Sequence, residues 1–259
     1  MSEQETAHFE QDMRPAPVPI WLEGLVGLEW LTLRAAPVYW GWGVPRGAGA
    51  PVVVVPGFLG SDLYLYELYW WLRRMGYRAH YSRIGRNAEC LDVVRSRLIA
   101  TIDRVHAEAG RPVHVIGHSL GGMLARSAAA HHPEQVASVV TLGSPFRGIR
   151  SHPLVLQASD RVRARITLRP GAESRPGCFT GYCGCEAVAG LRQGLPASVP
   201  DLAVYSRTDG IVDWRYCIND DPEGNVEVSG THIGMVFNPQ VYRLLATRLA
   251  ELEAAPAGR

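Results

Sequence analysis

A serine between glycines at positions 117 to 121 is the first place in this sequence where chemistry is expected. An apolar run, Val113–Ile116, leads into Gly117-His118-Ser119-Leu120-Gly121, and good helix formers follow. A strand, a sharp turn and a helix would leave the Ser119 hydroxyl exposed at the turn, where small glycines let strand and helix approach closely. The amide of Leu120, at the start of the helix, would point at an oxyanion formed beside the serine. Ser119 is therefore a candidate nucleophile.

A serine nucleophile needs an imidazole that removes its proton and a carboxylate that fixes the imidazole tautomer. Both residue types follow Ser119 at the ends of expected strands. Asp209 comes after a strand over 202–205, and His232 comes in the loop after a strand over 226–228. We therefore expect His232 to act as the base and Asp209 as the acid that orients it.

Two nearby residues compete for these roles. Asp213 lies four residues after Asp209 and could be the acid instead, but Asp209 directly follows the strand and has Gly210 behind it, as a tight loop requires. His118 adjoins Ser119, yet a tight turn is expected to point it away from the serine. We interpret His118 as structural.

A second glycine-rich turn predicts the other half of an oxyanion hole. Val52–Val55 has no polar alternation, which indicates a strand buried on both faces, and Pro56-Gly57-Phe58-Leu59-Gly60 follows it. Such a loop places backbone amides at the carboxyl edge of a sheet, where α/β proteins bind ligands. The Phe58 amide is the candidate second donor. Apolar residues in and after the loop predict a hydrophobic acyl pocket, for which the candidates are Leu59, Tyr64 and Trp70.

The elements that position these residues alternate between strand and helix from residue 52 onward, with helices expected over 63–75 and 88–109. This alternation predicts an α/β domain over 52–259 with a mostly parallel sheet covered by helices on both faces. The alternation lapses at about 145–200, which we interpret as a lid-like insertion over the sheet edge. A helix over 240–252 closes the domain.

Residues 1–51 are expected to form an irregular lead-in and an amphipathic helix over 20–36. The apolar stripe of this helix is expected to pack on the domain, although its aromatic content leaves open association with a membrane surface. The stripe consists of Trp21, Leu22, Leu25, Leu28, Leu31 and Leu33.

Composition excludes several classes of protein. At 259 residues, with 47% hydrophobic residues, the chain suits one large domain, and its net charge of +1 gives no reason to expect nucleic acid as a partner. The chain contains no lysine, which excludes Schiff-base chemistry, phosphate-binding P-loops and Ser-x-x-Lys acylases. An acidic N-terminus without an apolar core is unlike a secretory signal, so a cytoplasmic protein is expected.

The cysteines leave two alternatives open. Cys178, Cys183 and Cys185 have the wrong spacing for zinc and no histidine pair nearby, so we expect neither a metal nor any other cofactor. A disulfide from this cluster to Cys217 and plain reduced thiols are both compatible with the sequence.

Five segments together resemble the α/β-hydrolase superfamily of serine hydrolases, and most closely its bacterial lipases and esterases (triacylglycerol lipase-like). They are Pro56–Gly60, Gly117–Gly122, Thr141–Pro145, Tyr205–Val212 and Ser229–His232. The resemblance implies a Ser119, His232 and Asp209 triad, oxyanion amides from Phe58 and Leu120, and hydrolysis of a small-molecule or lipid ester through an acyl-enzyme. Pro56 departs from many lipases, which have histidine before the glycine.

Two other functions are compatible with these residues. An acyltransferase or thioesterase acting on a carrier-bound acyl group would use the same triad with a different acceptor. A noncatalytic binding protein with this fold would not need an intact triad. The oligomeric state and the acyl chain length have no signature in the sequence.

Overall fold

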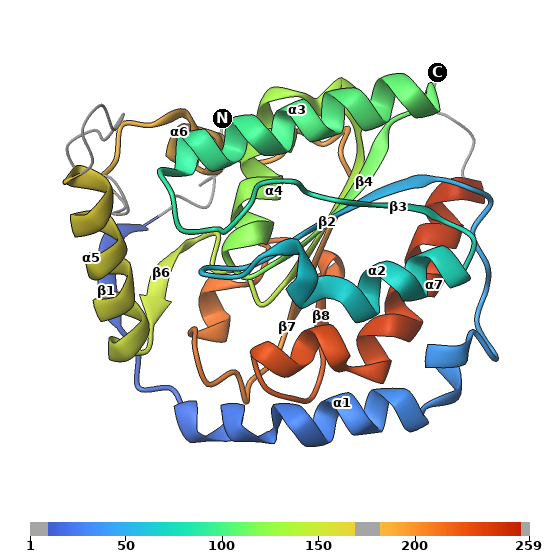
Figure 1. Ribbon diagram of the computed structural model, residues 1–259, viewed down its shortest axis with the longest axis horizontal. Helices are drawn as coiled ribbons and strands as arrows, with labels where there is room; N and C mark the ends of the chain where they lie inside the picture. Colours follow the sequence, from blue (N-terminus) through green and yellow to red (C-terminus); the bar gives the residue numbers. More distant parts are fainter. Residues whose placement is uncertain (1–9, 169–181, 255–259) are drawn as a thin grey trace, which may run out of the picture.

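A six-stranded parallel sheet forms the centre of the computed structural model, which describes residues 10–168 and 182–254. Every neighbouring pair in it is parallel, as the alternation of strands and helices predicted. In spatial order the strands are β3 (Arg78–Tyr81), β2 (Pro51–Val55), β4 (Val113–His118), β5 (Val136–Leu142), β7 (Asp201–Tyr205) and β8 (Asn225–Glu227). The fold is that of the expected class, an α/β sheet with helices on both faces (Figure 1).

The valines of β2 show why both faces are covered. Successive strand residues point to opposite faces, and Val53 and Val55 pack in one hydrophobic cluster while Val52 and Val54 pack in another. All four side chains are fully buried. The first cluster lies under α3 (Leu91–Ala109), α4 (Leu120–His131) and α6 (Glu186–Gln193), and the second under α2 (Tyr66–Arg74) and α7 (Pro239–Ala254).

Within 145–200, where the sequence predicts a lid-like insertion, the structure describes three elements, β6 (Gly148–Ser151), α5 (Pro153–Thr167) and α6. β6 pairs in parallel with β1 (Glu10–Pro15), so the N-terminal segment is tied to the insertion in a small second sheet. The sequence did not indicate β1, because its residues are mostly polar and show no alternation. In Figure 1, α5 and β1 lie together at one side of the main sheet.

The N-terminal helix begins as a 3₁₀ turn, η1 (Ile20–Leu25), and continues as α1 (Val26–Ala35). It packs on the domain, but the prediction that its apolar stripe makes the contact is wrong. Leu33 is buried, whereas Trp21 is 76% exposed and Leu28 62% exposed. The face turned toward the protein carries carboxylates that accept hydrogen bonds from main-chain amides of two loops.

Short 3₁₀ turns connect many of the remaining elements. These are η2 (Pro37–Trp40), η3 (Asp62–Leu65), η4 (Pro133–Gln135), η5 (Trp214–Tyr216), η6 (Pro222–Gly224) and η7 (Ile233–Phe237). Across residues 10–168 and 182–254, no helix combines the length and the apolar character that crossing a bilayer requires.

Candidate active site

Ser119 lies in the turn between β4 and α4, with φ of +53°. A positive φ is costly for a residue with a side chain, and such strain is found where surrounding structure enforces it. Here the Ser119 amide donates to the Leu142 carbonyl of β5 at 2.8 Å. A Cβ at Gly117 would lie 2.4 Å from the Gly122 Cα, and one at Gly121 would lie 2.3 Å from the Val55 carbonyl oxygen. The glycines are therefore required by close backbone approach, as the sequence indicated.

Asp209 and His232 meet at the carboxyl ends of β7 and β8. The His232 Nδ1–H donates to Asp209 Oδ2 at 2.6 Å, and both side chains are almost completely buried. The other carboxylate oxygen, Oδ1, accepts from the amides of Ile211 and Val212, each at 2.8 Å. With the proton on Nδ1, the imidazole keeps a lone pair on Nε2, which is the tautomer that a general base needs.

The pKa of His232 is raised above its ordinary value although the ring is buried. Burial is the largest influence and lowers the pKa, because it disfavours the charged ring. The charge of Asp209, its hydrogen bond to Nδ1 and the charge of Glu23 all raise it, and together they outweigh burial. The site is thus built to stabilise a positive imidazolium.

The two competing residues have other positions. Asp213 caps η5 by accepting from the Arg215 amide at 3.0 Å, so Asp209 is the carboxylate beside His232. His118, which we expected to point away from Ser119 and to be structural, donates its Nε2–H to the backbone carbonyl of His232 at 2.9 Å. Burial lowers the pKa of His118 to about 3, which keeps this ring neutral. His118 therefore connects the nucleophile turn to the loop of His232.

The loop at Pro56–Gly60 lies against the nucleophile turn, where a Cβ at Gly57 would lie 3.0 Å from the Ser119 Cβ. Asn87, which the sequence did not single out, holds this loop. Its side-chain Nδ2 donates to the Pro56 carbonyl at 2.9 Å. Its main-chain carbonyl accepts from the Leu59 amide and its main-chain amide donates to the Gly60 carbonyl, each at 2.9 Å. Three bonds from one buried residue thus fix the backbone on both sides of Phe58.

Two cavities meet at Ser119. One, of about 310 Å³, is lined by both Ser119 and His232 and also by Leu59 and Tyr64, two of the three expected pocket residues. The third, Trp70, lines neither cavity and is 45% exposed on α2, where its ring packs edge to face on Tyr69.

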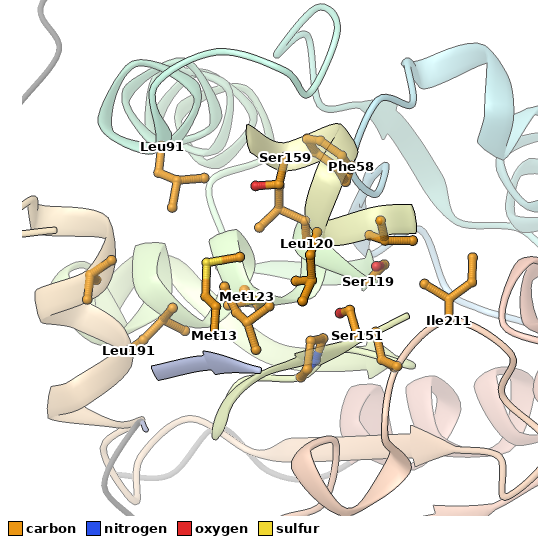
Figure 2. Close-up of a pocket in the computed structure, with 16 residues that line it drawn as sticks. Met13, Phe58, Leu91, Ser119, Leu120, Met123, Ser151, Ser159, Leu191 and Ile211 are labelled. Carbon is orange, nitrogen blue, oxygen red and sulfur yellow. The ribbon is translucent and has the colours of Figure 1, made fainter. Parts of the chain in front are cut away.

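The second cavity, of about 80 Å³, is lined mainly by apolar side chains and also by three serines, Ser119, Ser151 and Ser159. Figure 2 shows Leu120, Met123 and Met13 along it, with Ser119 toward one end. Met13 comes from β1 and Val155 from α5, so the lead-in and the insertion both contribute to the wall. Sequence reasoning missed Met13 because an isolated methionine in a polar segment gives no signal.

The part of the chain that the structure describes contains no group of histidine, cysteine and acidic side chains arranged to hold a metal ion. Cys90, Cys183, Cys185 and Cys217 are free thiols, all buried. In the described part of the chain, neither Cys183 nor Cys185 is joined to Cys217 by a disulfide. Cys178 lies outside the described residues.

Comparison with known proteins gives consistent similarities. A family model described as the alpha/beta hydrolase fold matches residues 101–168. The chain is 30% identical over 140 residues to a triacylglycerol lipase of Burkholderia plantarii, covering 48% of this chain and 37% of that protein. It is 32% identical over 114 residues to a triacylglycerol lipase of Pseudarthrobacter phenanthrenivorans, covering 38% of this chain and 34% of that one. The match thus spans little more than a third of either lipase.

A solved structure extends the similarity of fold over most of the chain. The mature form of the Bacillus licheniformis lipase BlEst2 superposes with a TM-score of 0.58 at 18% identity, covering 80% of this chain and 95% of that one. At this identity the likeness concerns the fold alone.

Proposed function

We propose that the chain is an α/β hydrolase of the lipase and esterase type, and that it hydrolyses carboxylic esters with Ser119 as nucleophile. One observation carries the proposal. The buried Asp209–His232 pair, joined at 2.6 Å, lines the same cavity as Ser119 through its histidine. A base oriented by a carboxylate beside a serine on a strained turn is the arrangement that activates a hydroxyl for acyl transfer.

In the first half of the proposed reaction, His232 Nε2 takes the Ser119 proton while Oγ attacks the ester carbonyl carbon. The carbonyl oxygen becomes an oxyanion, which the amides of Phe58 and Leu120 stabilise from the loop after β2 and the start of α4. Collapse of this intermediate breaks the carbon–oxygen bond to the alcohol. The alcohol leaves with the proton from His232, and the acyl group stays on Ser119.

In the second half, His232 removes a proton from water, whose oxygen attacks the acyl carbon. Collapse returns the proton to Ser119 Oγ and releases the carboxylic acid. The charge of Asp209 stabilises the imidazolium in both halves. The apolar cavity lined by Leu120 and Met123 favours a hydrophobic acyl group.

The test uses p-nitrophenyl esters of increasing acyl length with the wild-type chain and Ser119→Ala. Removing the nucleophile of a serine triad lowers kcat by about 10⁶. We therefore expect turnover only with the wild type, while the exposed Ser61→Ala variant stays active. A fluorophosphonate should label the wild type and not Ser119→Ala. Absence of both labelling and ester turnover would refute the proposal and favour a binding protein.

Product analysis in the presence of alcohol or thiol acceptors separates hydrolysis from acyl transfer. A hydrolase releases mostly the free acid even when the acceptor is present. An acyltransferase would release mostly the new ester or thioester.

A further inference from the structure

The carboxylate of Glu23 on η1 joins the loop of the acid to the loop of the base. Its Oε1 accepts from the amide of Gly210, the residue after Asp209, and from the amide of His232, each at 2.9 Å. Its Oε2 accepts from the Ile233 amide, also at 2.9 Å. One side chain from the N-terminal segment is therefore bound to main-chain atoms next to both partners of the buried pair.

We propose that Glu23 is a positioning residue for the reaction, holding the Asp209 and His232 loops together and supplying a negative charge to the imidazolium. This inference rests on the proposed function, in which His232 must be oriented by Asp209. Hydrogen bonds from amides to a carboxylate are about twice as strong as neutral ones. Three of them converge on Glu23, and they add to the bonds from the Ser206 and Thr208 hydroxyls to the Gly230 carbonyl in restraining the relative position of the two loops.

The charged and titratable groups around the His232 ring decide how strongly the charge of Glu23 acts on the pKa of His232. Asp209 accepts from Nδ1, and Glu23 lies at the backbone of His232. The neutral ring of His118 has its centroid 4.8 Å from that of His232. The Tyr64 hydroxyl donates to the Ile233 carbonyl, and burial raises the pKa of Tyr64 and so keeps it neutral. Glu23 and Asp209 both raise the pKa of His232, so the N-terminal segment adds to the field at the base.

Glu29, on α1, provides a matched comparison. It accepts from the Thr231 amide at 2.7 Å and from the Thr231 hydroxyl at 2.6 Å, so it also binds the loop of His232. Among the described residues its hydrogen bonds are to Thr231 alone, and it makes none to the Asp209 loop. Glu29 therefore anchors the helix to one loop, whereas Glu23 bridges two.

The C-terminal end of α1 is fixed independently of Glu23, so the helix is a rigid support for the Glu23 side chain. Glu67 on α2 accepts from the Trp30 indole at 2.8 Å, from Arg34 at 2.9 Å and from the Tyr39 hydroxyl at 2.5 Å. Charge-assisted bonds at both ends keep α1 in place although most of its apolar side chains face solvent.

The experiment compares Glu23→Gln, Glu23→Asp and Glu29→Gln. In Glu23→Gln the new side chain lacks the charge and turns an NH₂ group toward at least one of the three amide donors. We therefore expect kcat to fall about tenfold, which is about 1.4 kcal/mol in activation free energy, with KM little changed. The acid limb of the kcat/KM profile should move to lower pH. Glu23→Asp keeps the charge but is one methylene shorter, so kcat should fall while the limb stays in place. Glu29→Gln should lower thermal stability without moving the limb.

An NMR titration of the His232 imidazole, assigned by its loss in His232→Ala, gives a readout that does not depend on turnover. The inference is supported if His232 titrates at lower pH in Glu23→Gln than in the wild type and in Glu29→Gln. It is overturned if the three titrate alike, or if Glu23→Gln and Glu29→Gln lose the same stability and keep the same kcat. A wild-type chain inactive on every ester refutes the proposed function, and the titration still decides the role of Glu23.

Discussion

Replacing Asp209 by asparagine should abolish most activity through the tautomer of His232. Asp209 Oδ1 accepts two amide hydrogens, from Ile211 and Val212, so the asparagine oxygen must keep that position. Its NH₂ group then faces His232 Nδ1 at a separation of 2.6 Å in the wild type. Nδ1 can accept from this group only by giving up its proton, and the proton moves to Nε2. An imidazole with a proton on Nε2 has no lone pair for the Ser119 hydroxyl.

The size of the loss in kcat follows from the change of the His232 tautomer. A wrong tautomer in a Ser–His–Asp triad costs about 10⁴ in kcat, or about 5.4 kcal/mol at roughly 1.36 kcal/mol per tenfold change. Steady-state hydrolysis of p-nitrophenyl butyrate measures it, and thermal denaturation checks that the variant is folded. Asp213→Asn is the control, since Asp213 only caps η5, and it should retain kcat within about twofold of the wild type. The tautomer mechanism is refuted if Asp209→Asn keeps a tenth of the wild-type kcat, or if Asp213→Asn loses as much kcat as Asp209→Asn.

Three further outcomes are expected. The base must be neutral and the pKa of His232 is raised, so kcat/KM should be lost on the acid side with a midpoint above the ordinary histidine pKa of about 6.5. A pH-stat assay measures this midpoint, and a value below about 6.5 would contradict the expectation. Gly121→Ala should destabilise the fold by about 3 kcal/mol and lower Tm by roughly 6–12 °C, since the new Cβ meets the Val55 carbonyl. Gly24→Ala should leave Tm unchanged, because a Cβ at Gly24 would have open space. Asn87→Ala should lower kcat about tenfold by loosening the Phe58 loop, and unchanged kinetics would show that the loop needs no such support.

The sequence predicted those parts of the molecule whose physical constraint is local. Four valines in a row can be satisfied only in a strand covered on both faces, and β2 is such a strand. The glycines around Ser119 are required by contacts between segments a few residues apart in the turn, together with one neighbouring strand. The sequence also placed Asp209 and His232 after the strands that now carry them, because parallel strands end at one edge.

The parts that could not be predicted depend on contacts between distant segments. A stripe of leucine and tryptophan at helical spacing normally indicates a buried face, but the amides of the Asp209 and His232 loops attract Glu23 and Glu29 and turn the stripe outward. The sequence predicts Trp70 in the pocket because it is an aromatic residue that follows the Pro56–Gly60 loop. The buried face of α2 instead carries Leu68, Trp71 and Leu72, and this leaves Trp70 at the surface.

The position of η1 and α1 has a consequence for how the chain folds during synthesis. Glu23 meets its partners about 190 to 210 positions later in the sequence. At about 5–20 residues per second, the ribosome takes roughly 10–40 seconds to deliver those partners. Throughout this interval the Glu23 carboxylate lacks its three amide partners, whereas Glu67, which binds the other end of the helix, follows Trp30 by only 37 positions. The bridge between the Asp209 and His232 loops can therefore form only after Ile233 has been synthesised, whereas the contacts of α1 with Glu67 can form much earlier.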